Sequence, residues 1–553
     1  MQKYEELLRA LLCKRGITDE TQADIFLNPD YERDMHDPFL MQDMERACVK
    51  LFEVIGNKEK TIIYADYDCD GIPGAVILRD LFKKIGYENY EVYIPARNSE
   101  GYGLNLEAVK KFVQSKVKLI VTVDLGITAV SEIAQAKADG MDVIITDHHL
   151  PHEVLPRAYA ILNPKVDDYP EKMLCGAGVV FKLAQGFIKK YGEYYKIKKG
   201  FEKWMLDMAG LATLSDLVPL TGENRAIAYF GMKVLKKSSR PGLQRLLAKL
   251  NIDQKHLTED DIGFMITPRL NAASRMDDPR KAFELLSTDN EVNAGMIADH
   301  LSQINDDRKT IVASIMREVN KKLEKDVSRS EKEVIVIGNP LWRVGVLGLV
   351  AGKICDEWGK PVFVWGKDEN NVIKGSCRSD GSVSLVELMT DTEESFLDFG
   401  GHEFAGGFAV HAEKIHFLED SLCLSYGKMK RDKAETEIVY DIKSDLSVVN
   451  MKTWREIERL APFGLANPKP VFLFENVKVD NIKKFGKNGS GEHLEITFSD
   501  KSTKEIKAVS FFSNNESFKV PLSSGKKVNL LAIFDLSRFR GKVELRLRVE
   551  DII

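Results

Sequence analysis

Thr61-Ile-Ile-Tyr-Ala-Asp66-Tyr-Asp68-Cys-Asp70-Gly71 is a short apolar run that ends in three aspartates on alternate residues. Carboxylates crowded in this way repel one another, so the cluster is stable only where cations or protons neutralise it. Mg²⁺ and Mn²⁺ both favour carboxylate oxygens, and Mn²⁺ accepts imidazole more readily. The simplest interpretation is a divalent metal site with two ions at the end of a strand.

Two further apolar runs end in metal-binding residue types. Leu119–Val123 is followed by Asp124, and Val143–Thr146 is followed by Asp147-His148-His149. The runs alternate with helical segments, which is typical of a parallel sheet covered on both faces. The carboxyl ends of such strands meet at one edge, where ligands bind. Adjacent histidines in an extended segment point apart, so we expect one to bind a metal and the other to contact phosphate or donate a proton.

Length and composition limit the class of protein. A chain of 553 residues is too long for one hydrophobic core, and 44% hydrophobic with 29% charged residues is ordinary for a globular protein. No apolar run reaches the ~18 residues that cross a bilayer, so we expect no membrane association. The seven cysteines contain no Cys-x-x-Cys pair, which argues against disulfides or structural zinc and favours the cytoplasm. With a net charge of −5, any contact with nucleic acid must come from local patches.

The rest of the chain divides into helical, mixed and all-β parts. Residues 176–290 are mostly helical in pattern and place Asp216 just before a proline-limited helix end, and Glu291–Lys325 predicts a long connecting helix. A second strand–helix pattern spans Val334–Cys377, and short alternating strands after Pro470 predict a small barrel. We therefore expect an α/β protein with two parallel-sheet lobes, a connecting helix and a C-terminal β-barrel. The expected divisions are 1–55, 56–290, 291–328, 329–432 and 433–553.

Several glycine and arginine motifs suit phosphate binding. Gly400-Gly401-His402 combines glycines, whose backbone N–H groups can approach an anion, with an imidazole donor. Ser376 and Arg378 lie two residues apart after a strand and would share one face. Arg97 precedes Glu-Gly-Tyr-Gly, and Arg275 ends a segment with a second arginine. Each of these arginines alone could equally form a surface ion pair.

The C-terminal part is locally basic. Residues 501–553 contain 7 Lys and 4 Arg against 6 acidic residues. Phe534, Arg538, Phe539 and Arg540 combine aromatic faces with cations, and such pairs can stack bases and hold backbone phosphates. A core aromatic flanked by solvated arginines is the alternative interpretation.

Together these motifs resemble those of the DHH phosphoesterase family. The segments around Asp66, Asp124, Asp147 and Asp216 are similar, in order, to its four metal-site motifs, and Gly400–His402 is similar to the signature of its associated DHHA1 domain. Four further segments narrow the resemblance to the RecJ branch, the bacterial 5′-to-3′ exonucleases specific for single-stranded DNA: 97–104, 269–275, 342–348 and 461–468. The resemblance runs from about residue 20 to the end.

The resemblance implies a hydrolase with two divalent ions, Mn²⁺ or Mg²⁺, and an OB-fold that grips the strand. It implies that the metals are surrounded by Asp66, Asp68, Asp70, Asp124, His148 and Asp216. It makes His149 and His402 candidate catalytic residues, the latter at the scissile phosphate beside Gly400 and Gly401. A pocket for the 5′ phosphate would contain Arg97, Arg275, Ser376 and Arg378. Five residues depart from the usual family pattern, none of them an expected metal ligand: Cys69, Ile72, Ser274, Arg343 and Ala466.

We therefore expect a monomeric, cytoplasmic nuclease of DNA repair and recombination. Its expected substrate is single-stranded DNA, and candidate partners include a helicase and a single-strand binding protein. One alternative is a phosphodiesterase of the same superfamily that acts on cyclic dinucleotides or short RNA. The other is a non-catalytic scaffold, but scaffolds related to this family have typically lost metal ligands, whereas every motif acid is present here.

Overall fold

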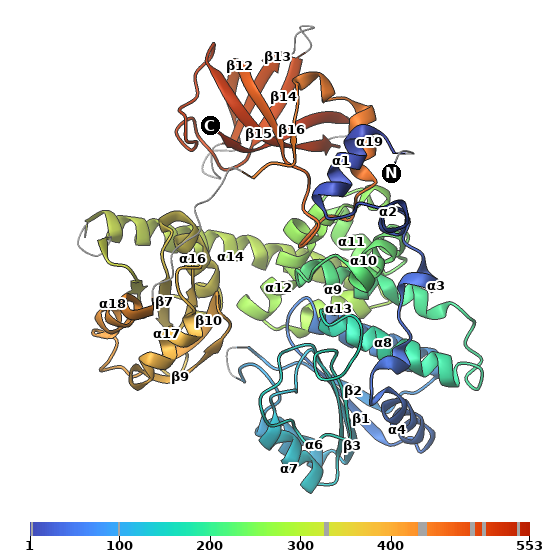
Figure 1. Ribbon diagram of the computed structural model, residues 1–553. Helices are drawn as coiled ribbons and strands as arrows, with labels where there is room; N and C mark the ends of the chain where they lie inside the picture. The colour runs from blue at the N-terminus through green and yellow to red at the C-terminus, as the bar shows by residue number, and fades with distance from the viewer. Residues whose placement is uncertain are drawn as a thin grey trace. The chain divides into compact units, whose positions relative to one another are not determined.

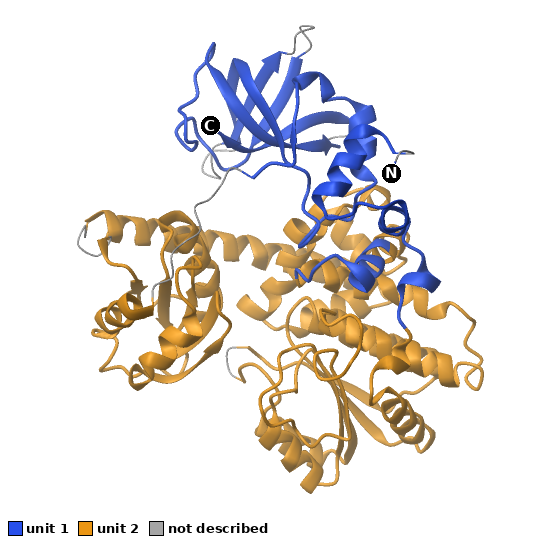
Figure 2. Cartoon of the chain, in the orientation of Figure 1, with its two compact units in different colours: residues 1–36, 217–229, 436–553 blue, residues 37–216, 230–435 orange. Residues whose placement is uncertain are grey.

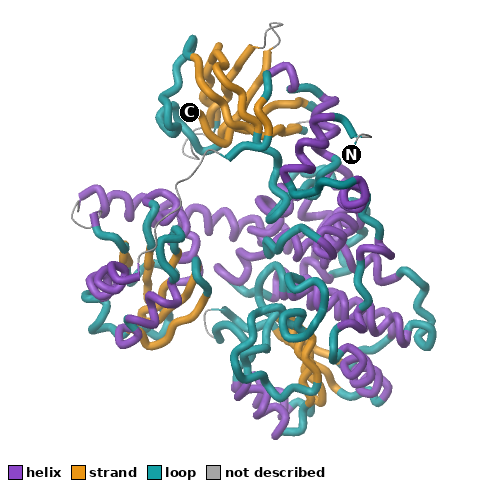
Figure 3. The backbone as a smooth tube through the Cα atoms, viewed as in Figure 1, coloured by secondary structure: helices purple, strands orange, loops and turns teal. Residues whose placement is uncertain are grey.

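The computed structural model describes residues 1, 4–97, 100–325, 331–429, 439–486, 493–499, 505–538 and 542–553. The chain forms two compact units (Figure 2). The smaller unit, unit 1, contains residues 1–36, 217–229 and 436–553, and unit 2 contains residues 37–216 and 230–435. The strands form three separate groups (Figure 3). Among the described residues, no helix is both long enough and apolar enough to cross a membrane.

The first sheet of unit 2 is parallel, with the strand order β2-β1-β3-β4-β5. Its strands β1, β2 and β3 are labelled in Figure 1. Its runs of β-branched residues are buried on both faces, as expected for a parallel sheet. Helices α6 and α7 pack on one face, and α5 and α8 pack together against the other. The predicted strands are confirmed to within two residues. The bounds are β1 (Lys60–Ala65), β2 (Tyr90–Tyr93), β3 (Val117–Val123), β4 (Asp142–Thr146), β5 (Ala160–Leu162), α5 (Gly71–Ile85), α6 (Leu106–Gln114), α7 (Val130–Ala138) and α8 (Gly176–Tyr191).

The predicted helical part and the long helix are also confirmed. Helix α14 (Glu291–Lys325) buries one stripe of residues at intervals of three and four, which explains why a charged segment stays helical. The other helices of this part are α9 (Leu206–Ser215), α10 (Gly222–Leu235), α11 (Pro241–Lys249), α12 (Thr267–Met276) and α13 (Arg280–Ser287), and α4 (Met44–Gly56) precedes the first sheet.

The second sheet of unit 2 is mixed, with the strand order β6-β7-β8-β10-β9, so the prediction of a second parallel lobe is wrong. Only β6 and β7 are parallel, and the other neighbours are antiparallel. The connection between β7 and β8 is a tight loop in which Asp368 accepts hydrogen bonds from the N–H groups of Asn370 and Val372. Such a loop reverses the chain, whereas a parallel neighbour requires a long crossover. The bounds are β6 (Ile335–Gly338), β7 (Val362–Lys367), β8 (Ile373–Arg378), β9 (Phe396–Gly401), β10 (Ala405–Val410), α16 (Leu347–Trp358), α17 (Leu385–Asp391) and α18 (Leu418–Met429).

Unit 1 contains the predicted β-barrel, which closes because β12 pairs with both β13 and β15. The N-terminal helices share its hydrophobic core: Leu8 and Leu12 belong to the same cluster as Leu460 and Phe472. The sequence did not predict this association. The elements are α1 (Glu6–Lys14), α2 (Glu20–Leu27), α3 (Tyr31–Asp34), α19 (Met451–Glu458), β11 (Ile442–Lys443), β12 (Phe472–Phe485), β13 (His493–Ser499), β14 (Glu505–Ser510), β15 (Lys527–Ser537) and β16 (Glu544–Ile552).

The barrel corrects one predicted nucleic-acid contact. Phe534 is only 3% exposed and packs on Phe472, with 4.8 Å between ring centroids, so its ring belongs to the core and offers no face to a base. Arg538 is exposed, as a strand contact requires. Phe539 and Arg540 lie outside the described residues.

A buried ion-pair network joins three helices of unit 2. Arg240, just before α11, donates to Asp207 on α9 (Nε–Oδ2, 2.7 Å) and to Asp80 on α5 (Nη2–Oδ2, 2.6 Å). Ser238 also donates to Asp207 at 2.9 Å. Asp80 has a second partner in Arg79, at 2.8 Å, whereas Arg240 is the cation paired with Asp207, so its removal would leave the buried charge of Asp207 without a counter-charge.

We predict that Arg240→Met lowers the free energy of unfolding by about 3–5 kcal/mol, the range for breaking a buried ion pair from one side. Arg245→Met is the matched control, because the side chains of Arg245 and its partner Glu291 are 50% and 70% exposed, and exposed pairs contribute about 0–1 kcal/mol. Urea unfolding followed by circular dichroism measures both variants. Equal losses in the two would contradict a special role for the buried network.

Candidate metal centre and phosphate pocket

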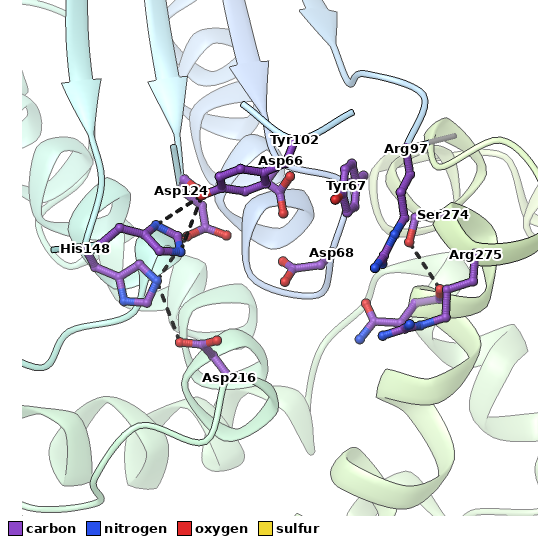
Figure 4. Close-up of a pocket in the computed structure, with 12 residues that line it drawn as sticks. Asp66, Tyr67, Asp68, Arg97, Tyr102, Asp124, His148, Asp216, Ser274 and Arg275 are labelled. Atoms are coloured by element: carbon purple, nitrogen blue, oxygen red, sulfur yellow. Dashed lines mark hydrogen bonds and ion pairs between the residues drawn. The ribbon is translucent and has the colours of Figure 1, made fainter. Parts of the chain in front are cut away.

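The predicted acids gather at the carboxyl edge of the first sheet. Asp66 follows β1, Asp124 follows β3 and His148 lies just beyond β4, while Asp216 comes from the C-terminal end of α9. These residues line a pocket of about 300 Å³ (Figure 4). Figure 4 shows the acids and His148 around one side of the space, with Arg97 and Arg275 on the other side.

Three groups of side chains have spacings suitable for a metal. They are Asp66–Asp68–Asp124, Asp70–His148–Asp216 and Asp124–His148–His149, and within each group one ligand atom per residue lies within 4.8 Å of the others. Asp124 and His148 each belong to two groups, an arrangement that suits two neighbouring ions. Asp66 Oδ1 is buried and accepts no hydrogen bond from the described residues. The oxygen and nitrogen donors therefore fit Mn²⁺ or Mg²⁺.

Asp70 is held by the N-terminus of α8. The backbone N–H groups of Gly176 and Ala177 donate to its two carboxylate oxygens, at 2.6 and 2.7 Å. Position 176 requires glycine because Asp124 also lies close to it: a Cβ there would be 2.5 Å from the Asp124 Cβ. The helix terminus favours negative charge and fixes the carboxylate plane. Cys175-Gly-Ala-Gly is therefore part of the site, although the sequence analysis assigned it no function.

The backbone at Asp124 is strained. Its φ of +63° lies in the left-handed region, which is uncommon for a residue other than glycine. The backbone N–H of Asp124 donates to the Thr146 carbonyl at 2.9 Å, which ties the ends of β3 and β4 together. Such strain is typical of functional positions, where the surrounding structure enforces it.

The two histidines lie closer together than expected. Their ring centroids are 4.6 Å apart, so the expectation that adjacent histidines point apart is wrong here. His148 Nε2 lies 3.1 Å from Asp124 Oδ1, and His149 Nδ1 lies 2.8 Å from Asp147 Oδ1. Asp147 also accepts the backbone N–H groups of both histidines, at 2.7 and 3.0 Å. This carboxylate bends the chain so that both rings face the pocket.

Burial and, after it, charge crowding favour the protonated form of the acids. Burial, followed by repulsion from Asp68, raises the pKa of Asp70 to about 7. Burial and the charges of Asp70 and Asp68 raise the pKa of Asp216 to about 9, and the pKa values of Asp66 and Asp124 are raised for similar reasons. Burial, together with its neighbour His149, lowers the pKa of His148 to about 3, so its imidazole is neutral and able to bind a metal.

Arginines form the opposite side of the pocket. Arg97 and Arg275 line it directly. Burial, followed by the charges of Arg97, Arg308 and Arg378, lowers the pKa of Arg275 to about 10. Ser376 and Arg378 lie beside each other against Gly348, because a Cβ at that glycine would be 3.5 Å from Ser376 Oγ and 3.2 Å from Arg378 Nη2. Cations crowded together on one side of a pocket indicate a site for an anion.

The glycine–histidine motif lies apart from these residues. Gly400 and Gly401 end β9, and the backbone N–H of His402 donates to the Ala405 carbonyl at 2.8 Å in a tight turn. A Cβ at Gly401 would lie 2.4 Å from the same carbonyl oxygen, so the turn itself requires that glycine. None of the three residues is among those that line the pocket. The structure therefore does not bring His402 together with the acids.

Further residues line the pocket that the sequence analysis assigned no role. Tyr102, between two glycines with left-handed φ, has its hydroxyl 3.4 Å from both ring nitrogens of His149. Asn271 lines the pocket with a buried Oδ1 that lacks a hydrogen bond among the described residues. Ser274, one of the departures from the family pattern, is also in the lining, whereas Cys69 is buried beside Ser215 at 3.4 Å.

We predict that the metal-free protein becomes less stable as pH rises from 7 to 9. A carboxyl whose pKa is higher in the folded than in the unfolded state keeps its proton only when folded, so stability is lost as pH passes through the folded value. The pKa of Asp216 is raised to about 9, and the pKa values of Asp66, Asp124 and His149 are raised as well. All four groups therefore lower the stability of the folded state as the pH rises. His148 adds nothing in this window, because its imidazole is neutral in both states above about pH 6.5.

Thermal unfolding midpoints in EDTA at pH 7, 8 and 9 measure this effect. We expect a fall of several degrees in the wild type and a smaller fall in Asp216→Asn, which lacks the carboxyl. Midpoints that rise with pH, or an unchanged slope in the variant, would contradict the predicted crowding.

Comparisons with known proteins match these features. Family models match residues 60–213 (DHH family, N-terminal domain), residues 331–423 (DHHA1 domain) and residues 440–551 (RecJ OB domain). The chain is 32% identical to the single-stranded-DNA-specific exonuclease RecJ of Bacillus subtilis (strain 168), over 99% of this chain and 67% of that protein. It is 30% identical to the protein of the same description from Haemophilus influenzae, over 99% of this chain and 96% of that protein.

Solved structures agree. A crystal structure of RecJ in complex with Mn²⁺ from Thermus thermophilus has a TM-score of 0.81 and 25% identity, and the match covers 99% of this chain and 75% of that chain. A crystal structure of exonuclease RecJ bound to manganese has a TM-score of 0.63 and 28% identity, and that match covers 71% of this chain and 97% of the other. On the full-length identity and the shared domains, the chain belongs to the RecJ family.

Proposed function

We propose that this chain is a single-stranded-DNA-specific exonuclease that removes nucleotides from the 5′ end by metal-dependent hydrolysis. The observation that carries the proposal is the pocket in which ligand-type acids on one side face arginines on the other. An ion on the acidic side and a terminal phosphate on the arginine side would place a phosphodiester between them. Membership of the RecJ family supports the choice of DNA as the substrate.

The proposed ligands of two Mn²⁺ or Mg²⁺ ions are Asp66, Asp68, Asp70, Asp124, His148 and Asp216. Bound ions of this kind lower the pKa of water and stabilise the charge on a phosphoryl group. The chain's own contribution is orientation. The N-terminus of α8 fixes Asp70, and Asp147 holds His149 through Nδ1, so that its Nε2 is available to the substrate or to water.

The 5′-to-3′ direction of digestion would be set by the arginine side of the pocket. Arg97, Arg275, Ser376 and Arg378 form the proposed 5′-phosphate pocket, since guanidinium groups match a terminal phosphate with paired hydrogen bonds. Asn271, with its unpaired buried oxygen, is a further candidate for contact with the substrate. His402, with Gly400 and Gly401, stays the proposed contact to the scissile phosphate, and its support is the family resemblance.

The five expected divisions of the chain are kept as the proposed domains, with the barrel as the module that holds the strand. No observation favours the cyclic-dinucleotide alternative. Deletion of the barrel would be a poor test of it, because α1 and α2 share the barrel core and would lose their packing. Direct assay of a cyclic dinucleotide is better. We also propose that the protein acts as a monomer in the cytoplasm, with a helicase and a single-strand binding protein as partners.

We predict that Asp124→Asn lowers the rate of hydrolysis of 5′-phosphorylated single strands by about a thousandfold or more, because metals supply several kcal/mol to such reactions. Asp139→Asn, an exposed aspartate after α7, is the control and should retain the wild-type rate. Calorimetric titration with Mn²⁺ should show lost binding in the first variant only. Near-normal turnover by Asp124→Asn, or equal digestion of blunt duplex by the wild type, would contradict the proposal.

We predict that Arg275→Gln lowers kcat/KM for 5′-phosphorylated strands by about 10- to 150-fold, the loss of one hydrogen bond to a charged group. The rate on strands with a 5′ hydroxyl should change little, so the preference for the phosphate should shrink. Arg280→Gln is the matched control, because Arg280 is exposed and paired with Asp278. An unchanged preference in Arg275→Gln would argue against the phosphate pocket.

A further inference from the structure

Exposed aromatic rings cluster at one end of three adjacent barrel strands. Phe485 ends β12 and pairs with His493 at the start of β13, while Phe511 and Phe512 follow β14 directly. His493 is the centre of the cluster: its ring centroid lies 5.2 Å from that of Phe485, 5.5 Å from Phe511 and 4.9 Å from Phe512. The three phenylalanines are 39%, 43% and 79% exposed. We call these four residues the ring cluster.

Local structure holds the ring cluster on the surface. The backbone N–H of Phe512 donates to His493 Nδ1 at 2.9 Å, which fixes the turn after β14 to the neighbouring strand. Phe512 has a φ of +58°, in the left-handed region that a residue with a bulky side chain rarely adopts. An exposed phenyl ring on strained backbone contributes nothing to the barrel core, and such features are typical of binding surfaces.

Charge near the ring cluster favours an anionic, planar partner. Arg546 on β16 is fixed by Asp535, with Nε 2.6 Å from Oδ2, and its guanidinium carbon lies 5.9 Å from the centre of the Phe511 ring. Lysine and arginine outnumber acidic residues 11 to 6 over residues 501–553, although the whole chain carries a net charge of −5. Aromatic faces beside cations bind single strands by stacking bases and holding phosphates.

We infer that the ring cluster of Phe485, His493, Phe511 and Phe512 is a stacking platform for the bases of single-stranded DNA. The inference rests on the proposed function and assigns strand contacts to the barrel. These residues differ from those that the sequence suggested, of which Phe534 lies in the core. Stacking on phenyl rings is tolerant of sequence because every base has a π-face, as a nuclease that digests any strand requires.

The test uses the full-length protein in EDTA, so that the strand is bound without hydrolysis. The probes are 5′-phosphorylated thymidine oligonucleotides with one 2-aminopurine at successive positions, since stacking quenches its fluorescence. We expect quenching at one or more positions in the wild type and an about 5- to 150-fold loss of affinity in Phe512→Gly, the range for one stacked base. Glycine suits the left-handed backbone, so this variant removes the ring without straining the fold.

Two further variants complete the design. Phe512→Tyr keeps an aromatic face and should bind as the wild type does. Val543→Ala removes another exposed apolar side chain of the barrel, 57% exposed, and should also leave binding unchanged. Val543→Ala should also hydrolyse 5′-phosphorylated single strands at the wild-type rate.

The outcomes separate the inference from the proposed function. If the wild type binds the strands but Phe512→Gly binds equally well, or if no position is quenched, the platform is wrong and the exonuclease proposal stands. A Phe512→Tyr variant that loses as much affinity as Phe512→Gly would show that an aromatic face does not account for binding, which also overturns the inference. A wild type that neither binds nor hydrolyses single strands would overturn both.

Discussion

Repulsion between buried carboxylates is the constraint on which the rest of unit 2 depends. Four acids with pKa values raised by burial and by one another gather at one edge of the first sheet, and no surface charge network could compensate for them at a distance. The fold supplies compensation locally instead. Parallel strands deliver the acids to one edge, and the N-terminus of α8 supplies two N–H groups to the most enclosed of them. The negative charge that these contacts do not neutralise can be neutralised by bound cations.

On the other side of the pocket, the crowded and mutually repelling groups are positively charged arginines. Burial, followed by the charges of Arg97, Arg308 and Arg378, lowers the pKa of Arg275 to about 10. A protein that only needed to be stable would pair such arginines with the nearby aspartates. Keeping the two sets apart preserves an unsatisfied positive and an unsatisfied negative surface within one site, which suits a ligand that carries phosphate and is attacked at phosphorus.

Local patterns in the sequence were sufficient to predict the first sheet and most of the acidic site. Strand ends loaded with acids identified the edge at which Asp66, Asp124 and His148 meet, because parallel topology fixes where such ends lie. Three features of the structure could not be predicted from the sequence. The mixed second sheet depends on the short connection after β7, which the β-branched runs do not reveal. The role of Gly176 depends on an approach between α8 and Asp124 that only three-dimensional packing creates. Phe534 was predicted to contact bases, and the ring cluster was not predicted, because alternation marks one face of a strand without saying which face is the core.

Unit 1 draws its core from both ends of the chain, and this has a consequence for biosynthesis. Leu8, Leu12 and Leu27 leave the ribosome early, yet their partners from Leu446 onward are made 419 residues after Leu27. At ~5–20 residues per second the nascent helices wait roughly 20–80 s with apolar side chains exposed. The barrel can mature only after its last strand, β16 (Glu544–Ile552), has been made, so a chain terminated before that strand would expose the apolar sides of α1 and α2. Quality control could recognise such fragments by that surface, even where the nuclease unit had already folded.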